Sequence, residues 1–531
     1  MTKTVSTEAR SVETSQRAGL LEIGPDRTLT VEDVVTVARG RRAVRLSAAA
    51  RPAMEASRAV VERVLADGRT VYGITTGFGD LATVRVTPEE AGALQRNLVR
   101  SHAAGVGEPL PAEVVRAMLL LRADALARGL SGVRPELADQ LLALLEADIL
   151  PIVPSRGSVG ASGDLAPLAH LALAVIGEGS VMVGDDMLPA LEALQQAGLR
   201  PLELGAKEGL ALLNGTQLMS AVGSLGLADA TRLAESADLV AAMSVEAMRG
   251  SDEPFAAPIH AARPHAGQQT VAANMRRLLE DSANRDGHLH DDHRVQDAYS
   301  LRCIPQVHGA ARDALGLLAA SLAVEINSVT DNPLVVAPSA DYPDGAVLSG
   351  GNFHGEPLAI PLDVATIAVT ELASISERRI ARLVDASLSG GLPPFLTADS
   401  GRNSGYMVAQ YTAAALINEL QSLAHPSSVH SLPTSANQED HVSMGATSAL
   451  QFRAAVEHAE RVLGIEAMCA AQGLDFLPDP VGPRVAAVHG AVRAAIAHLD
   501  EDRALAADIA QAAELIRSGS LLSAVEDWAR P

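Results

Sequence analysis

Long helical sequence without breakers sets the strongest limit on how this chain can fold. The segment Leu362–Asp385 contains no glycine or proline over 24 residues, which corresponds to about 36 Å of helix. The same alanine- and leucine-rich character marks Tyr406–Ala424, Ser443–Gln472, Lys207–Met248 and Gly309–Val329. Alternating strand patterns rich in β-branched residues are scarce. The sequence therefore predicts a mainly α protein with a central bundle of long helices.

One uncharged run raises the question of a membrane. The 20 residues between Glu208 and Asp229 carry no charge, and that length can cross a bilayer. However, Asn214, Thr216 and Gln217 are polar, and no basic cluster flanks the run. An apolar helix that contains such side chains is typical of the interior of a large protein. We therefore expect a buried helix and no membrane span.

Composition excludes several classes of partner. The 531 residues carry 42 Lys plus Arg against 64 Asp plus Glu, a formal net charge of −22. Such an acidic chain offers no electrostatic footprint for DNA or RNA. Cys303 and Cys469 are the two cysteines, too few for a disulfide framework or a cysteine-rich zinc site. The polar N-terminus lacks the apolar core of a secretory signal, so we expect a cytoplasmic protein.

The patterning predicts four regions along the chain. Residues 1–18 are polar and without periodicity, which indicates a disordered tail. We predict an N-terminal domain over residues 19–205, with an amphipathic helix at Ala112–Gly129. The long helices occupy 206–480, and further helices follow over 481–531.

The segment Leu150–Pro167 is the first candidate for a functional loop, because it is rich in proline, glycine and serine. Within it, Ala161, Ser162 and Gly163 are small enough for the backbone to fold back on itself. In a compressed loop the amide nitrogen of Gly163 can attack the carbonyl carbon of Ala161. Loss of two waters would then leave an imidazolone ring with Ser162 converted to an electrophilic methylidene. From spacing alone, an ordinary flexible loop or a helix N-terminus capped by Ser162 remains the alternative.

The wider sequence resembles the aromatic amino acid ammonia-lyase and aminomutase family. The motif GSVGASGDLAPLAH at 157–170 carries the resemblance, which extends from about residue 28 to 480. Further blocks occur in the family's order: YGITTGFGDLA at 72–82, NLVRSHAAGVGEPL at 97–110, EGLALLNGTQ at 208–217, QDAYSLRCIPQVHGA at 296–310, TDNPL at 330–334, SGGNFHGEP at 349–357 and SANQEDHVSMG at 435–445.

The resemblance implies a prosthetic group and an assembly. In the family the Ala-Ser-Gly triad, here Ala161, Ser162 and Gly163, forms a 4-methylidene-imidazole-5-one group (MIO). No metal or dissociable cofactor is then expected, because the electrophile comes from the chain itself. The resemblance also implies a homotetramer whose active sites are built from several chains, with a small-molecule amino acid as substrate.

Several side chains receive roles from the resemblance. Tyr72 matches the catalytic base, a phenol with an ordinary pKa near 10 whose anion must be stabilised. Tyr299 and Gln296 match positions that line the site near the MIO. Arg302 matches the bidentate partner of the substrate carboxylate, and Asn214 the amide that contacts the substrate or the MIO oxygen. Taken alone, Tyr72 could be a packing residue and Arg302 part of a surface ion pair.

Three further residues concern the substrate ring. Phenylalanine and tyrosine enzymes of the family typically read Asn-Gln-Asp in this motif, which places an amide where this chain has the carboxylate of Glu439. A carboxylate can accept a hydrogen bond from an imidazole N–H, whereas beside a phenyl ring it would be a costly buried charge. His102 would also hold the imidazole, and Phe353 would pack against it. The resemblance is therefore to the histidine-acting branch, with trans-urocanate and ammonia as expected products.

Three alternatives stay open at this point. A 2,3-aminomutase on the same scaffold would use the same MIO and return ammonia to the β-carbon, depending on how tightly the loop around Tyr72 closes. A tyrosine ammonia-lyase is a second alternative, and the carboxylate of Glu439 argues against it. A non-catalytic helical scaffold is a third, and it predicts damage in the Ala161–Gly163 triad, Tyr72 or Arg302; all of these are intact.

Overall fold

The structure is a computed structural model that describes residues 19–77, 87, 90–287 and 295–525. The predicted tail, residues 1–18, lies outside the described residues. The chain divides into two compact units, each made of three separate segments: unit 1 comprises Met1–Leu225, Ala319–Leu362 and Pro426–Leu450, and unit 2 comprises Gly226–Leu318, Asp363–His425 and Gln451–Pro531. The domain boundaries expected at 205/206 and 480/481 stay predictions.

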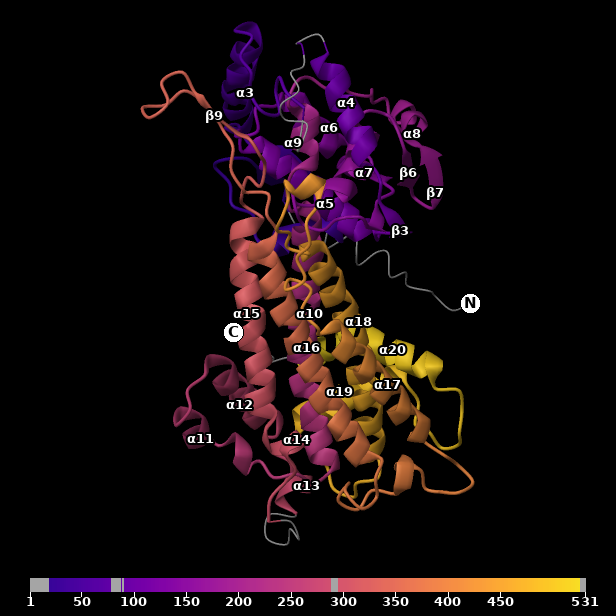
Figure 1. Ribbon diagram of the computed structural model, residues 1–531. Coiled ribbons are helices and arrows are strands. Elements are labelled where there is room, and N and C mark those ends of the chain that lie inside the picture. The colour runs from indigo at the N-terminus through magenta and orange to yellow at the C-terminus, as the bar shows by residue number, and fades with distance from the viewer. Residues whose placement is uncertain (1–18, 78–86, 88–89, 288–294, 526–531) are drawn as a thin grey trace. The chain divides into compact units, whose positions relative to one another are not determined.

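Helices dominate the described part of the chain, which confirms the mainly α prediction (Figure 1). The longest are α3 (Ala50–Ala66), α10 (Gln217–Ala247), α15 (Ile304–Glu325), α16 (Glu356–Leu383), α17 (Met407–Leu423) and α18 (Gly445–Leu474). The shorter helices are α2 (Val31–Ala38), α4 (Ala91–His102), α5 (Ala112–Ala127), α6 (Pro135–Glu146), α7 (Leu165–Val175), α8 (Ala190–Gln196), α9 (Glu208–Leu213), α11 (Ala257–Ala261), α12 (Ala266–Leu278), α13 (Ala283–Asp286), α14 (Tyr299–Arg302), α19 (Pro483–Ala495), α20 (Ala506–Arg517) and α21 (Ser520–Ser523).

Close packing and buried ion pairs hold the long helices of unit 2 together. Figure 1 draws α10, α16 and α18 side by side in this unit, and a Cβ added to Gly473 of α18 would lie 3.1 Å from the Cβ of Ala247 in α10. Asp238 of α10 accepts hydrogen bonds of 2.8 Å from the Nδ1 of His308 in α15 and from Arg312. A fully buried ion pair also joins Arg379 of α16 to Glu466 of α18, in which Nη2 of the arginine donates to Oε2 of the glutamate at 2.8 Å.

The start of α16 differs from the prediction. The absence of proline suggested a helix from Leu362, but the structure begins it at Glu356 and encloses Pro361. Proline removes one helical hydrogen bond, and in the second turn only the carbonyl of Pro357 loses its partner. This small local cost does not stop the helix.

The uncharged run forms two helices instead of one. Helix α9 ends at Asn214, whose backbone is extended, and α10 begins at Gln217. Between them Gly215 has a φ of +149°, a conformation that favours glycine. Every residue from 207 to 227 is buried, which confirms the predicted burial of the run. By length and apolar composition alone α15 and α16 could cross a membrane, although 72% of the apolar window of α16 is buried within the protein.

Helix α5 lies at the centre of unit 1. The sequence predicted one apolar face, but 14 of its 16 residues are buried, so the amphipathic interpretation was wrong. The reason is packing, because α2, α3 and α6 all contact this helix. Even the guanidinium of Arg122 is fully buried.

The strands in the described ranges are short and form four small sheets. The pairs are β1 (Leu21–Ile23) with β2 (Val44–Leu46), β3 (Val106–Pro109) with β5 (Pro154–Arg156), β8 (Leu334–Val336) with β9 (Ala346–Leu348), and β4 (Ile149–Pro151) with β6 (Ser180–Val183), which in turn pairs with β7 (Asp186–Pro189). Only the first pair is parallel. The predicted loop Leu150–Pro167 is shorter than expected, because β4 and β5 occupy its first part and α7 begins at Leu165. The remaining glycine-rich loop, residues 157–164, is therefore anchored at both ends.

Candidate active site

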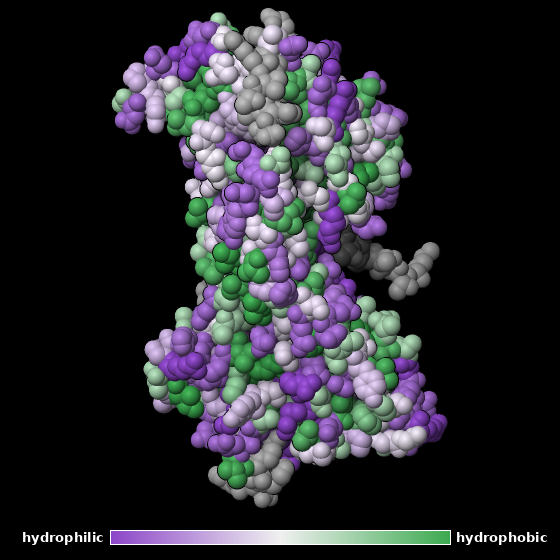
Figure 2. All heavy atoms as spheres, in the orientation of Figure 1, coloured by the Kyte–Doolittle hydropathy of each residue, from purple (hydrophilic) through white to green (hydrophobic). Residues whose placement is uncertain are grey.

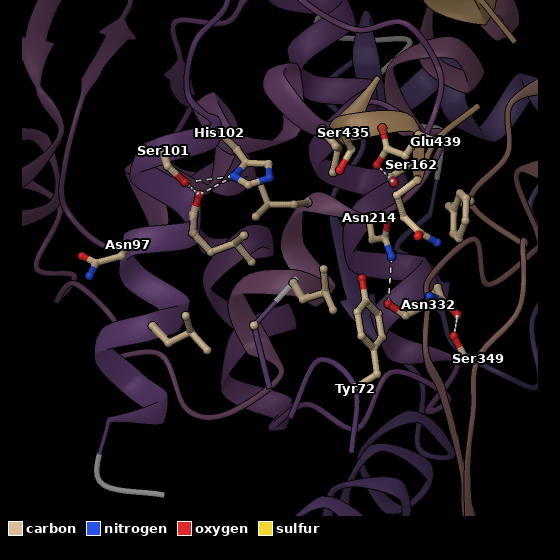
Figure 3. Close-up of a pocket in the computed structure, with 18 of the residues that line it drawn as sticks. Tyr72, Asn97, Ser101, His102, Ser162, Asn214, Asn332, Ser349, Ser435 and Glu439 are labelled. Carbon is tan, nitrogen blue, oxygen red and sulfur yellow. Dashed lines mark hydrogen bonds between the residues drawn. The ribbon is translucent and has the colours of Figure 1, made fainter. Parts of the chain in front are cut away.

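A cavity of about 880 Å³ opens in unit 1 (Figure 3). Its walls come from α4, α9, the glycine-rich loop with the first residue of α7, and four further segments, at residues 72–77, 332, 349–353 and 435–439. Of the eleven side chains predicted for the site, six line the cavity: Tyr72, His102, Ser162, Asn214, Phe353 and Glu439. Ala161 and Gly163 flank Ser162 in the chain, so the structure gathers eight of the eleven positions in one place.

The Ser162 side chain is held by Glu439 across the cavity. Its hydroxyl donates a hydrogen bond of 2.9 Å to Oε1 of Glu439, and Figure 3 shows the two side chains pointing toward one another. The second carboxylate oxygen accepts a 2.7 Å bond from the hydroxyl of Thr434. The backbones of Thr434 and Glu439 also exchange N–H···O bonds of 2.8 and 3.3 Å. Glu439 is therefore fixed at both oxygens and through its backbone.

The turn at Gly163 is crowded against the break between α9 and α10. Gly163 has a φ of +75°, and a Cβ added there would lie 2.1 Å from the carbonyl oxygen of Gly215. On the other side of the turn, a Cβ on Gly160 would lie 2.1 Å from Oγ of Ser443. Ala161, between these glycines, is only 5% exposed. The loop is compressed from two sides, and only glycine can occupy either point of contact.

Asp164 joins this loop to the start of α10. Its Oδ2 accepts bonds of 2.8 and 3.2 Å from the backbone N–H groups of Leu218 and Met219, and its own N–H donates to Gly215 at 2.7 Å. The other oxygen, Oδ1, is buried and finds no hydrogen-bond partner among the residues that the structure describes. Burial raises the pKa of Asp164 to about 7, an effect that the two backbone N–H groups only partly offset.

A buried cation lies behind Asn214. Arg122 donates to the carbonyl of Asn214 at 2.6 Å and to Oε1 of Gln217 at 3.1 Å. Burial lowers the pKa of Arg122 to about 10, so the group keeps its charge at neutral pH. The Asn214 amide donates to the carbonyl of Asn332 at 2.8 Å, while its Oδ1 has no partner within the described ranges.

The segment that carries Asn332 is itself tied down by a buried ion pair. Nζ of Lys207 lies 2.8 Å from Oδ2 of Asp331, and both side chains are fully buried. Sequence reasoning missed Asp164, Arg122, Lys207 and Thr434. The only local signal was the position of Asp164, directly after the triad and before a helix.

The contacts of His102 favour one tautomer. Its Nδ1 lies 2.9 Å from the carbonyl oxygen of Leu98 and 3.0 Å from Oγ of Ser101, whose hydroxyl itself donates to Leu98 at 3.1 Å. Because the carbonyl can only accept and the hydroxyl can also accept, a hydrogen on Nδ1 suits both contacts. Burial also lowers the pKa of His102 from its usual 6.5, which favours the neutral ring. Nε2 therefore presents a lone pair and can only accept a hydrogen bond.

Tyr72 lies on the same side of the cavity as Asn214. Figure 3 shows its hydroxyl directed toward the Asn214 amide, with Asn332 and Ser162 beyond. The following residues 73–77 belong to the described chain, whereas the glycine at position 79, expected in the same loop, lies outside it.

The three remaining predicted residues do not line this cavity. Gln296, Tyr299 and Arg302 belong to unit 2, the last two in α14. Tyr299 is 70% exposed, and the guanidinium carbon of Arg302 lies 4.6 Å from the centre of its ring. Gln296 is exposed as well. Unit 1 therefore lacks the arginine that was expected to bind a substrate carboxylate.

Known proteins resemble this chain over almost its whole length. A family model described as aromatic amino acid lyase matches residues 29–494. Histidine ammonia-lyase from Gloeobacter violaceus is 55% identical over 502 residues, covering 94% of this chain and 96% of the relative. The enzyme of that name from Symbiobacterium thermophilum is 52% identical over 507 residues, covering 95% and 98%.

Solved structures show the same likeness. The crystal structure of histidine ammonia-lyase from Trypanosoma cruzi matches with a TM-score of 0.87 and 41% identity, covering 96% of each chain. Tyrosine aminomutase from Streptomyces globisporus matches with a TM-score of 0.89 and 38% identity, covering 96% of this chain and 99% of its own. Both an ammonia-lyase and an aminomutase therefore share the fold.

The buried carboxyl of Asp164 should make the protein less stable as the pH rises. The folded state keeps this proton up to about pH 7, whereas an unfolded aspartic acid loses it near 3.8, so the folded state binds more protons in between and the free energy of unfolding falls with increasing pH. Asp164→Asn cannot titrate, and the decline should shrink by at most about 4 kcal/mol across this interval. Urea denaturation at several pH values measures it.

Asp341→Asn, which changes an exposed aspartate, provides the control. Its free energy of unfolding should depend on pH as in the unsubstituted protein. An unchanged slope in Asp164→Asn would show that Asp164 is ionised in the folded state at acidic pH.

Proposed function

The chain belongs to the aromatic amino acid lyase family, and we propose that it eliminates ammonia from L-histidine with an electrophile made from Ala161, Ser162 and Gly163. It is a carbon–nitrogen lyase, and its relatives at 51–55% identity are histidine ammonia-lyases. The observation that carries the proposal is the hydrogen bond between Ser162 and Glu439. It sets the residue that would become the electrophile beside a carboxylate suited to an imidazole.

The residues around the loop suit an MIO group. The close approach of Gly163 to the carbonyl of Gly215 compresses the turn, which favours attack of the Gly163 nitrogen on the carbonyl carbon of Ala161. The buried Oδ1 of Asn214, without a partner in the described part of the chain, is available to a neighbouring polar group. An MIO supplies an electrophilic carbon for the substrate amine, which makes the nitrogen a better leaving group.

Two hydrogen-bond acceptors in the cavity select the substrate ring. Nε2 of His102 can only accept, as its tautomer requires, and the carboxylate of Glu439 can only accept when ionised. A neutral imidazole has one N–H group to donate and an imidazolium has two, whereas a phenyl ring has none. Conversion of Ser162 removes the hydroxyl that now occupies Oε1 of Glu439, so that this oxygen becomes free for the substrate. Phe353, which also lines the cavity, packs against the ring.

Tyr72 takes the proton from the β-carbon. Its phenolate needs a positive environment, and the buried charge of Arg122 behind Asn214 contributes one on this wall. The Tyr72 hydroxyl is directed to this side of the cavity (Figure 3), where the electrophile would also lie. Base and electrophile then act on neighbouring atoms of one substrate.

We further propose a homotetramer in which another chain supplies Gln296, Tyr299 and Arg302 to each cavity. These residues do not line the cavity of unit 1, yet the substrate carboxylate requires a cation. The long helices also leave hydrophobic side chains uncovered, as the green areas over them in Figure 2 show. Uncovered apolar surface of this kind favours association. The exposed side chains are Leu317 and Val324 of α15, Ile360 and Ile367 of α16, and Val408 and Tyr411 of α17.

The substrate assignment predicts that urocanate forms from L-histidine and that L-tyrosine and L-phenylalanine give no product. In Glu439→Gln, kcat/KM for histidine should fall about 30-fold, because loss of a charged hydrogen-bond partner costs ~2 kcal/mol. Product identity is read by ultraviolet spectrum and mass.

Glu136→Gln, which changes an exposed carboxylate of α6, should retain full activity. Coumarate from tyrosine would contradict the ring assignment, and a β-amino acid would identify an aminomutase.

The origin of the electrophile predicts a difference in intact mass. The purified protein should weigh two water molecules less than the translated chain. Gly163→Ala should retain the full mass, because its Cβ cannot fit beside Gly215. Gly490→Ala, whose Cβ would meet nothing within 4 Å, is the matched control and should lose both waters. A purified protein of full translated mass would refute the MIO.

Shared sites predict complementation between inactive variants. Tyr72→Phe and Arg302→Lys should each be inactive as pure tetramers. Co-expressed with different tags, they should form hybrids with measurable activity, because some cavities then combine an intact Tyr72 with an intact Arg302 from another chain. Hybrids isolated through both tags that remain inactive would place the two residues in the same chain's site.

A further inference from the structure

We propose that His354, Glu356 and His441 form a binding site for a divalent cation of the zinc type. Each side chain offers one ligand atom, and these atoms all lie within 4.8 Å of one another. All three residues belong to unit 1. Glu356 is the first residue of α16, His354 lies two residues before it, and His441 precedes α18. None of them lines the cavity described above.

The hydrogen bonding of His354 suits a metal ligand. Its Nε2 lies 3.2 Å from the carbonyl oxygen of His441, so this nitrogen carries the hydrogen and Nδ1 keeps its lone pair. A ligating histidine in proteins usually donates its other N–H in this manner, which fixes the tautomer and the ring orientation. Nδ1 accepts a hydrogen bond of 3.4 Å from the backbone N–H of Glu356. This distance is close to the limit for a hydrogen bond, so a cation that binds Nδ1 would replace only a weak interaction.

Glu356 supplies an independent observation. Its Oε2 is buried and has no hydrogen-bond partner in the part of the chain that the structure describes. A buried carboxylate oxygen without a partner is costly, and a cation would satisfy it. The rings of His354 and His441 lie next to each other with nearly parallel planes, at 3° and with 5.7 Å between their centres.

The ligand set decides the class of cation. Two imidazole nitrogens and one carboxylate suit Zn²⁺ and its neighbours Co²⁺ and Ni²⁺, whereas Mg²⁺ and Ca²⁺ prefer oxygen ligands throughout. In a tetrahedral zinc site, ligands at about 2.1 Å from the ion lie about 3.4 Å apart. The ligand atoms of this cluster lie within 4.8 Å of one another, so they would have to close by up to about 1.4 Å, which the exposed His441 side chain can provide by rotation.

Occupation of this site would join two walls of the cavity. His354 directly follows Phe353, and His441 lies two residues after Glu439; Phe353 and Glu439 both line the cavity. A cation bound by both segments restricts their relative movement. We therefore expect it to change KM for the amino acid substrate more than kcat, and to raise the thermal stability of the protein.

The test is a titration of the purified full-length protein with ZnCl₂, without histidine because this amino acid chelates zinc. Competition with a chromophoric chelator should reveal one tight site per chain. Glu356→Gln and His441→Ala should each lower the zinc affinity at least about tenfold. Even the loss of a residue that only hydrogen-bonds to a ligand lowers metal affinity by this factor. His265→Ala, which removes an exposed histidine of unit 2, should leave the affinity unchanged.

Two further readouts keep the result unambiguous. Co²⁺ bound in place of Zn²⁺ should show visible d–d bands that disappear in both ligand variants, and the melting temperature should rise with Zn²⁺ only in the unsubstituted protein and His265→Ala. Equal zinc affinity in all four proteins would overturn the inference, as would binding only in proportion to total histidine. Zinc binding is measured without turnover, so it succeeds or fails independently of the proposed reaction.

Discussion

The structure of the site depends on the lack of space between Gly163 and Gly215. A single methyl group at Gly163 would lie 2.1 Å from the Gly215 carbonyl, so the two backbones touch without any side chain between them. Gly215 can approach this closely because it occupies the break between α9 and α10. The break persists because Asp164, next to Gly163, satisfies the first N–H groups of α10. Loop and helix end therefore hold each other in place.

Buried charge is the second element of this arrangement. Arg122, Asp164 and the Lys207–Asp331 pair are all buried around the same helix break. Removing such groups from water costs free energy, and each is compensated by a backbone carbonyl, a helix N-terminus or an opposite charge. These contacts fix the positions of Asn214 and Asn332 on the cavity wall. The polar groups thus position the site, while apolar helices such as α5 supply the surrounding core.

Local sequence predicted those features that local physics determines. Long helices follow from the absence of glycine and proline, and the glycine-rich loop follows from its composition. The break at Gly215 and the full burial of α5 were missed, because both depend on residues far away in the chain. The same holds for the site: family motifs identified Tyr72 and Glu439, whereas Arg122 and Thr434 acquire a role only through their three-dimensional partners. Sequence alone also did not reveal that Arg302 does not line the cavity of unit 1.

The division of unit 1 into three segments determines when its loop can take its final shape. The last of these segments, Pro426–Leu450, contains both Ser443, which presses on Gly160, and Glu439, which holds Ser162. During synthesis from the N-terminus, the triad emerges long before either residue exists. The compressed turn can therefore arise only late, after more than four fifths of the polypeptide has left the ribosome. A nascent or truncated chain therefore lacks the contacts that hold the turn at residues 161–163 in place.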